Sequence, residues 1–112
     1  MKVITSSSPF GSFARTRALL ALRLLVESYP RELARLLDLN LSSVQKALHS
    51  LERDALVAAR VVGRTRLYRV SPRAPALAEL GRYLDGLLEP DDDLRARADV
   101  LRRRPRRARK PL

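Results

Sequence analysis

Residues 30–70 carry the pattern that most constrains how this chain can fold. The stretch PRELARLLDLNLSSVQKALHSLERDAL contains two apolar runs at helical spacing, with a short break at residues 38–40. The stretch VAARVVGRTRLYRV follows and contains two short runs of strand-forming residues on either side of Gly63. These patterns predict two amphipathic helices around a tight turn, followed by a small antiparallel hairpin.

The second helix of this pair has the clearest start. Asn40 is a favoured N-cap residue, and Leu39 and Val44 occupy the two positions of a hydrophobic staple. Apolar residues then continue at helical spacing, which predicts a helix from Leu41 to about Asp54. The opposite face of this helix carries donors rather than acids until Glu52. Its polar residues are Ser42, Ser43, Gln45, Lys46, His49 and Arg53.

The hairpin is basic at its tip. Gly63 can supply the positive φ that a tight hairpin turn needs. The side chains on or beside the turn are Arg60, Arg64, Thr65, Arg66 and Arg69. Like charges so close together repel one another, so we expect this tip to meet an anionic partner.

The flanking segments predict further helices. Residues 1–11 are serine-rich and are expected to form a flexible N-terminus. A first helix should run from about Ser12 to Ser28, because Tyr29 precedes a proline, and Pro30 then suits the first turn of a second helix that ends around Asp38. After the hairpin, residues 72–90 should hold a helix from about Ala76 to Leu88. Its apolar stripe is Leu77, Leu80, Leu84, Leu87 and Leu88.

Residues 91–112 are expected to form a short helix and a basic tail. The run from Asp91 to Asp93 suits a helix start, Leu94, Ala98 and Leu101 share one face, and Pro105 should end the helix. The tail residues that could add non-specific DNA affinity are Arg102, Arg103, Arg104, Arg106, Arg107, Arg109 and Lys110. RNA binding, binding of an acidic protein, or simple solubilisation are competing uses of this tail.

Charge and composition limit the possible classes of partner but do not identify one. The 112 residues suit one compact domain, and 23 Lys+Arg against 12 Asp+Glu give a net charge of +11. Residues 95–112 hold nine of these basic residues and one acid, so they carry +8 of the total. A basic balance suits nucleic acid, an acidic protein or an anionic membrane surface equally well.

Several classes of function lack the residues they need. The chain has no cysteine and a single histidine, so we expect no disulfide, no metal site and no cofactor. The stretch ALLALRLLV is broken by Arg23 and is too short to span a membrane. No signal peptide is evident. We therefore expect a cytoplasmic protein, which would be nucleoid-associated if the source is bacterial or archaeal. The sequence contains no glycine-rich phosphate loop and no Ser/His/Asp arrangement of the kind that enzymes use. We therefore do not expect an enzyme.

The order of helices and hairpin resembles the winged helix-turn-helix transcriptional regulators of the ArsR and MarR type. The corresponding segments are RELARLLDLNLSSVQKALHSLERDALV, from Arg31 to Val57, and GRTRLYRV, from Gly63 to Val70, and the resemblance covers roughly residues 12–88. It implies a mainly α fold, in which residues 12–71 form a three-helix core with an antiparallel wing and a C-terminal helix follows. Asp38 and Ala55 depart from the glycines usual in the family. The chain lacks the cysteine and histidine clusters of the metal-sensing members, so metal sensing is not implied.

The resemblance implies a sequence-specific protein that binds double-stranded DNA and regulates transcription. Its recognition helix, with the polar residues from Ser42 to Arg53, would enter the major groove, while the wing would touch the minor groove or the backbone. Gln45 could read adenine, Lys46 could reach guanine or a phosphate, and Arg64 and Arg66 should bind phosphates. We expect His49 to be solvated or phosphate-facing rather than a pH switch. The alternative is a protein-interaction adaptor or a non-specific nucleic-acid-binding module on the same fold.

The stripe on the C-terminal helix leaves two arrangements open. In a monomer it would cover the first helix, whereas in related regulators such flanking helices form a dimer, and two copies would match a two-fold operator. We favour the homodimer. A pocket between the first and last helices could hold a ligand, but no residue pattern names an effector, the operator or the direction of regulation.

Overall fold

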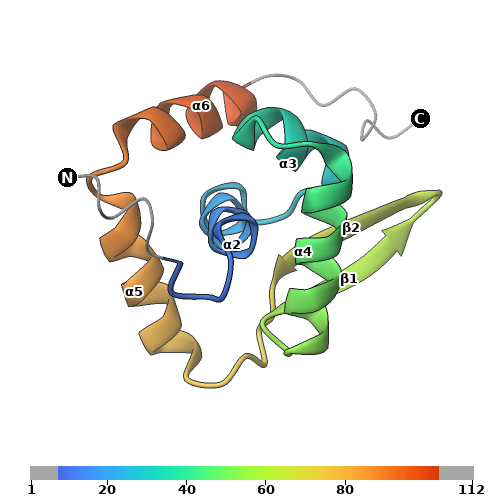
Figure 1. Ribbon diagram of the computed structural model, residues 1–112, viewed down its shortest axis with the longest axis horizontal. Helices are drawn as coiled ribbons and strands as arrows, with labels where there is room; N and C mark the ends of the chain where they lie inside the picture. The colour runs from blue at the N-terminus through green and yellow to red at the C-terminus, as the bar shows by residue number, and fades with distance from the viewer. Residues whose placement is uncertain (1–7, 104–112) are drawn as a thin grey trace.

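The computed structural model describes residues 8–103. Its elements follow the predicted order: α2 (Phe13–Leu25), α3 (Pro30–Leu37), α4 (Leu41–Arg53), β1 (Val57–Val62), β2 (Thr65–Val70), α5 (Leu77–Leu88) and α6 (Asp92–Arg103). The predicted fold class, mainly helical with one antiparallel hairpin, is confirmed for the described part of the chain (Figure 1). The tail residues from Arg104 to Lys110, and Pro105 with them, lie outside the described residues.

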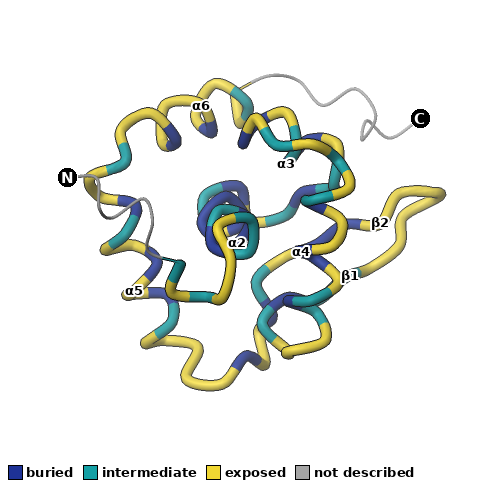
Figure 2. The backbone as a smooth tube through the Cα atoms, viewed as in Figure 1, coloured by how far each residue is buried: buried dark blue, intermediate teal, exposed yellow. Residues whose placement is uncertain are grey.

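α2 is the centre of the molecule. Figure 1 looks along this helix and shows α3, α4, α5 and α6 arranged around it. Leu19 and Leu22 are almost completely buried, and burial continues on several sides of the helix (Figure 2). A helix that is apolar around most of its circumference must be covered by several partners, which explains why α2 contacts every other helix.

α2 ends earlier than predicted. Its last helical residue is Leu25 rather than Ser28, and Val26 turns the chain with φ 74°. The Ser28 N–H donates to the Tyr68 carbonyl oxygen at 3.0 Å, and the Tyr68 N–H donates to the Ser28 carbonyl oxygen at 2.7 Å. The backbone of Ser28 therefore pairs with the edge of β2, a long-range contact that draws the chain out of the helix.

α4 begins and ends close to its predicted limits. The Asn40 side-chain oxygen accepts a hydrogen bond from the Ser43 N–H at 2.9 Å, as an N-cap residue does. Val44, Leu48 and Leu51 are buried against the core, so the predicted apolar face is confirmed. The helix has 13 residues and is therefore roughly 20 Å long.

Asp38 and Ala55 are two of the four non-glycine residues with positive φ in the described part of the chain. Asp38 ends α3 with φ 58° and ψ 46°, and Ala55 follows α4 with φ 65°. These are the two positions at which the family resemblance implies glycine. The fold keeps the backbone conformation that glycine would favour, at the cost of steric strain for the side chains that replace it.

Ala55→Gly should therefore stabilise the protein. Glycine removes the Cβ that is strained at positive φ, and after the entropy cost of glycine in the unfolded chain we expect a net gain of about 0.5–1 kcal/mol in the free energy of unfolding. The midpoint of urea unfolding measures this gain. Ala96→Gly, at an exposed position inside α6, is the control and should have the opposite sign, since glycine destabilises regular helix. A lower midpoint for Ala55→Gly would contradict the strained geometry.

The hairpin consists of two paired strands joined by a two-residue turn. β1 and β2 pair antiparallel from Val57 with Val70 to Val62 with Thr65, leaving Gly63 and Arg64 at the tip. Gly63 has the positive φ predicted for it, at 63°. Val57 and Tyr68 anchor the base of the hairpin in the core, while its tip projects away from the helices (Figure 1).

α5 and α6 complete the covering of α2. Leu84 and Leu88 from α5 and Leu94 and Ala98 from α6 are buried in the same core cluster as α2. The apolar stripe of α5 thus covers the first helix within one chain, although Leu77 at its start stays 40% exposed. The homodimer remains a prediction.

Two ion pairs tie these helices to α2. Arg23 holds Asp85 of α5 through two hydrogen bonds of 2.8 Å, and Arg17 holds Asp91 at 2.7 Å. Burial alone would raise the pKa of Asp91, but hydrogen bonds from Arg17 and the Leu94 N–H, together with the charges of Arg17 and Arg95, bring its pKa below the ordinary value.

The Asp91 ion pair should make stability depend on pH. Because the pKa of Asp91 is lower in the folded than in the unfolded protein, its contribution is present above the ordinary aspartate pKa of 3.8 and is lost as pH falls through the lowered value. Asp91→Asn should thus be less stable than wild type at pH 7, and this difference should shrink below about pH 4. Urea unfolding at both pH values measures it, with Glu89→Gln as the control for net charge. A difference that grew on acidification would contradict the pairing.

Candidate nucleic-acid interface

The outer face of α4 gathers the predicted recognition residues. Ser42, Gln45, Lys46, His49 and Arg53 are exposed and Ser43 is half-buried, so all six lie on the side of the helix that is turned away from the core. Figure 2 shows exposed and buried residues alternating along α4 in this way. Their roles in binding remain predictions.

This face has two flanks, because residues three or four apart lie on the same side of a helix. Gln45 and Glu52 lie on one flank, where Glu52 receives a hydrogen bond of 2.8 Å from Arg66 of the hairpin. The other flank carries Ser43, Lys46 and Ser50, and there Arg15 of α2 donates to the Ser50 hydroxyl. One flank of α4 thus faces the hairpin and the other faces the start of α2.

The predicted arginines of the hairpin are not one cluster. Arg60 stands opposite Leu67 and Arg66 stands opposite Val61, so the two arginines project from opposite faces of the ribbon. Arg60 binds the Glu27 carboxylate with two hydrogen bonds, of 2.8 and 2.9 Å, on the connection between α2 and α3. The sequence predicted Arg60 on or beside the hairpin tip, without its pairing to Glu27, because these two residues are 33 positions apart in the chain.

Arg66 joins the hairpin to α4. Besides Glu52, its guanidinium donates to the Tyr68 hydroxyl at 3.1 Å and lies 5.7 Å from the centre of the Tyr68 ring. Hydrogen bonds to Glu27 and Glu52, respectively, raise the pKa of Arg60 and of Arg66. Arg66 is therefore positioned beside the recognition face, and its charge balances the one acid on that face.

Arg64 and Thr65 remain at the tip of the hairpin. Both are exposed, and the Arg64 side chain makes no hydrogen bond or ion pair with any residue in the described range 8–103. Arg69 is likewise exposed and shares a face of the ribbon with Arg60 and Leu67. Arg64 is thus the predicted wing residue that is freest to reach a partner.

Sequence reasoning missed the part that Arg15 plays. Arg15 interrupts the apolar pattern of α2, but its guanidinium forms a 2.9 Å ion pair with Asp54 just beyond α4, in addition to its hydrogen bond to Ser50. No local pattern indicates this contact, because the partners are more than thirty residues away in the chain. The basic pair Arg102 and Arg103 ends α6, with Arg103 bound to Asp99 at 3.2 Å.

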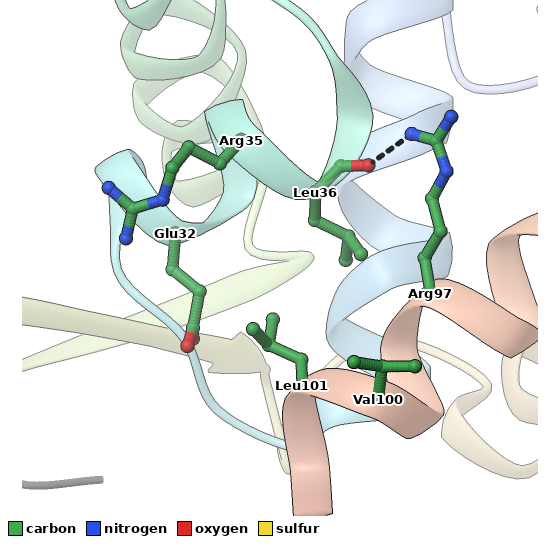
Figure 3. Close-up of a pocket in the computed structure, with 6 residues that line it drawn as sticks. All are labelled: Glu32, Arg35, Leu36, Arg97, Val100 and Leu101. Atoms are coloured by element: carbon green, nitrogen blue, oxygen red, sulfur yellow. Dashed lines mark hydrogen bonds between the residues drawn. The ribbon is translucent and has the colours of Figure 1, made fainter. Parts of the chain in front are cut away.

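Three of the cavities on the described surface lie beside these helices. One of about 590 Å³ lies between the start of α2 and α4. A second, of about 430 Å³, lies between α3 and α6, where Leu36, Val100 and Leu101 form an apolar wall (Figure 3). In that view Arg97 donates to the Leu36 carbonyl oxygen at 2.9 Å, which joins the two helices. A third cavity, of about 430 Å³, lies between Leu24 of α2 and the residues of α6. The sequence predicted a pocket between the first and last helices.

Neither a metal site nor a membrane span is found in the described range. Residues 8–103 contain no group of three or more histidine, aspartate or glutamate side chains placed to hold a metal ion. In the same range, the helices are too short or too polar to cross a membrane.

Comparison with solved structures identifies the fold. No protein-family model and no curated protein matches the chain. A mutant of Lactococcus lactis ZitR in its apo form is 22% identical, with a TM-score of 0.53 over 72% of this chain, and the match spans 64% of the length of ZitR. The adhesin competence repressor AdcR from Streptococcus pyogenes is 16% identical, with a TM-score of 0.59 over 88% of this chain and 80% of AdcR. The helix order, the hairpin after α4 and these two similarities together show that the chain has the winged helix-turn-helix fold.

Proposed function

We propose that this chain is a transcriptional regulator that binds double-stranded DNA in a sequence-specific manner. The supporting observation is the outer face of α4, which is exposed, rich in hydrogen-bond donors and flanked by a projecting basic hairpin. A helix of this size fits the B-DNA major groove, which is about 12 Å wide. The single acid of the face, Glu52, is paired with Arg66, so it offers little repulsion to phosphates.

The fold supports this proposal in a second way. AdcR, one of the solved structures that resemble the chain, is named a repressor. In its sequence, the chain also resembles winged-helix regulators of the ArsR and MarR type. As a DNA-binding regulator, it would act in the cytoplasm or nucleoid.

The proposed contacts divide between bases and backbone. Gln45 would read a base edge, and the serines at the start of α4 would bond either bases or phosphates. Arg64 at the hairpin tip would bind a phosphate or enter the minor groove. Arg66 would mainly position the hairpin against α4. Arg60 would have to leave Glu27 before it could reach DNA, so we give it a smaller part.

We further propose that the protein binds as a homodimer. Exposed apolar side chains near the start of α2 and on α5 and α6, among them Phe13, Tyr83 and Val100, support this proposal. Each is about half exposed, with Val100 at 59%, although Leu84 and Leu88 on α5 are already used inside the chain. A dimer would recognise an inverted repeat with half-sites about one helical turn apart.

The test is a selection of duplex fragments by the full chain near physiological salt, with excess unrelated duplex as competitor. The competitor suppresses the binding that net charge alone produces. Recovery of one sequence motif is the expected result, and an inverted repeat would support the dimer. Recovery of unenriched duplex would replace this proposal with a non-specific nucleic-acid-binding module, and recovery of no duplex would favour a protein-interaction adaptor.

A further inference from the structure

The cavity between α2 and α4 lies on the recognition side of the molecule. Its walls include Ala14 and Arg15 from the first turn of α2 and Ser43, Lys46, Ser50 and Arg53 from α4. At about 590 Å³ it is larger than the α3–α6 and α2–α6 cavities. We call it the α2–α4 groove. It opens on the flank of α4 that is turned away from the hairpin.

Arg15 holds the walls of this groove together. Its guanidinium binds Asp54 at 2.9 Å and the Ser50 hydroxyl, and only 16% of its side chain is exposed. The start of α2 is thereby fastened to the end of α4. The groove is thus shaped by charged and polar contacts that span more than thirty residues of sequence, rather than by a flexible loop.

The charges in the groove are all of one sign. Among the described residues that line it there is no carboxylate, and Asp54, which partners Arg15, lies outside the lining. Lys46 and Arg53 are exposed, and neither makes a hydrogen bond or ion pair with another residue of the described part of the chain. The α2–α4 groove is therefore lined by two cations without an ion-pair partner among the described residues, Lys46 and Arg53, and by Arg15, whose charge is neutralised by Asp54.

The two free cations form a row rather than a point. Lys46 and Arg53 are seven residues apart, which is two helical turns, or about 10 Å along the axis of α4. A row of positive charges along a groove suits an extended polyanion better than a single small anion. The sugar–phosphate backbone of nucleic acid is such a polyanion.

We propose that the α2–α4 groove receives the phosphate backbone of one DNA strand, on the side of α4 opposite the hairpin. In this arrangement Lys46 and Arg53 bind phosphates rather than bases, and the start of α2 is part of the DNA interface. The inference rests on the proposed function and extends it. α4 is then held in the major groove from both sides, with Arg64 on one strand and the α2–α4 groove on the other, and base reading falls to Gln45 and its neighbours.

The chain offers a matched pair of variants. Ala14 and Ala78 are each the second residue of their helix, α2 and α5, but only Ala14 lines the groove, and α5 lies across α2 from α4 (Figure 1). Ala14→Glu and Ala78→Glu change the net charge and the charge at a helix start equally. A difference between them in DNA affinity therefore reports the position of the new carboxylate.

Fluorescence anisotropy with the selected duplex and with an unrelated duplex measures the effect. Ala14→Glu should weaken binding to both duplexes by about tenfold or more, whereas Ala78→Glu should weaken it by about twofold or less. Ala14→Lys should tighten binding to both, a gain that partial unfolding cannot produce. Lys46→Ala should leave the sequence preference unchanged and lower the slope of log K against log salt by about 1.

The failure of this inference can be told apart from the failure of the proposed function. If wild type selects a motif but Ala14→Glu and Ala78→Glu bind alike, the groove lies outside the interface and the inference is overturned while DNA recognition stands. A changed base preference in Lys46→Ala would also overturn it, because Lys46 would then read a base. If wild type binds no duplex, the proposed function and this inference fall together.

Discussion

Replacing Leu84 by alanine should lower the free energy of unfolding by about 3 kcal/mol. Leu84 is completely buried and belongs to the core cluster that α5 shares with α2. Truncation removes apolar contacts and leaves a cavity that close-packed neighbours cannot fill completely, and such changes cost about 2–5 kcal/mol. Because small domains are stable by only about 5–15 kcal/mol, the loss is a large fraction of the total.

Urea unfolding of the Leu84→Ala variant at two protein concentrations measures this loss. Leu77→Ala is the control on the same helix, since Leu77 is 40% exposed and should cost less than about 1 kcal/mol. The loss at Leu84 should be the same at both concentrations, because α5 packs against α2 of its own chain. A loss that appeared only as dissociation of a dimer would show instead that α5 meets a partner chain.

Gln45→Ala should change which DNA sequence the protein prefers. Gln45 is exposed on the hairpin-facing flank of α4, and its amide can make two hydrogen bonds to an adenine edge in the major groove. A good bidentate contact contributes about 1–3 kcal/mol of discrimination, which corresponds to roughly 5- to 150-fold between the preferred and the altered base. The loss should be confined to one position of each half-site.

Arg64→Ala is the matched comparison. Arg64 sits at the turn of the hairpin and makes no contact with a described residue, so its loss should leave the fold and the base preference intact. It should weaken binding to all sequences about equally and lower the salt slope by about 1. Repeating the duplex selection with both variants separates the two roles. If Gln45→Ala selects the same motif as wild type, the assignment of Gln45 to base reading is wrong.

Local signals made α4 and the hairpin predictable. Asn40 caps α4 through a hydrogen bond to a residue only three positions away. Gly63 has the positive φ that its turn requires, which glycine adopts readily. In both cases the deciding interactions lie within a few residues of one another. The left-handed turns at Asp38 and Ala55 were located instead by the resemblance to winged helix-turn-helix regulators, in which glycine is usual at both positions.

The end of α2 and the state of the hairpin arginines were not predictable in this way. Ser28 leaves the helix because its backbone pairs with Tyr68, forty residues along the chain. Arg60 and Arg66 resemble their neighbour Arg64 in sequence, yet Glu27 and Glu52 hold them in ion pairs. Residue type and spacing carry no record of which distant carboxylate a cation will meet.

The sequence by itself determined the helices, the hairpin and the polar face of α4, because hydrophobic periodicity, caps and turn residues act over short distances. Only the tertiary structure decided which cations remain available to a partner and where they gather. Lys46 and Arg53 line a groove because packing brings the start of α2 to α4 and Arg15 fastens it there. Charge acts through space rather than along the chain, so the shape of a charged surface exists only once the chain has folded.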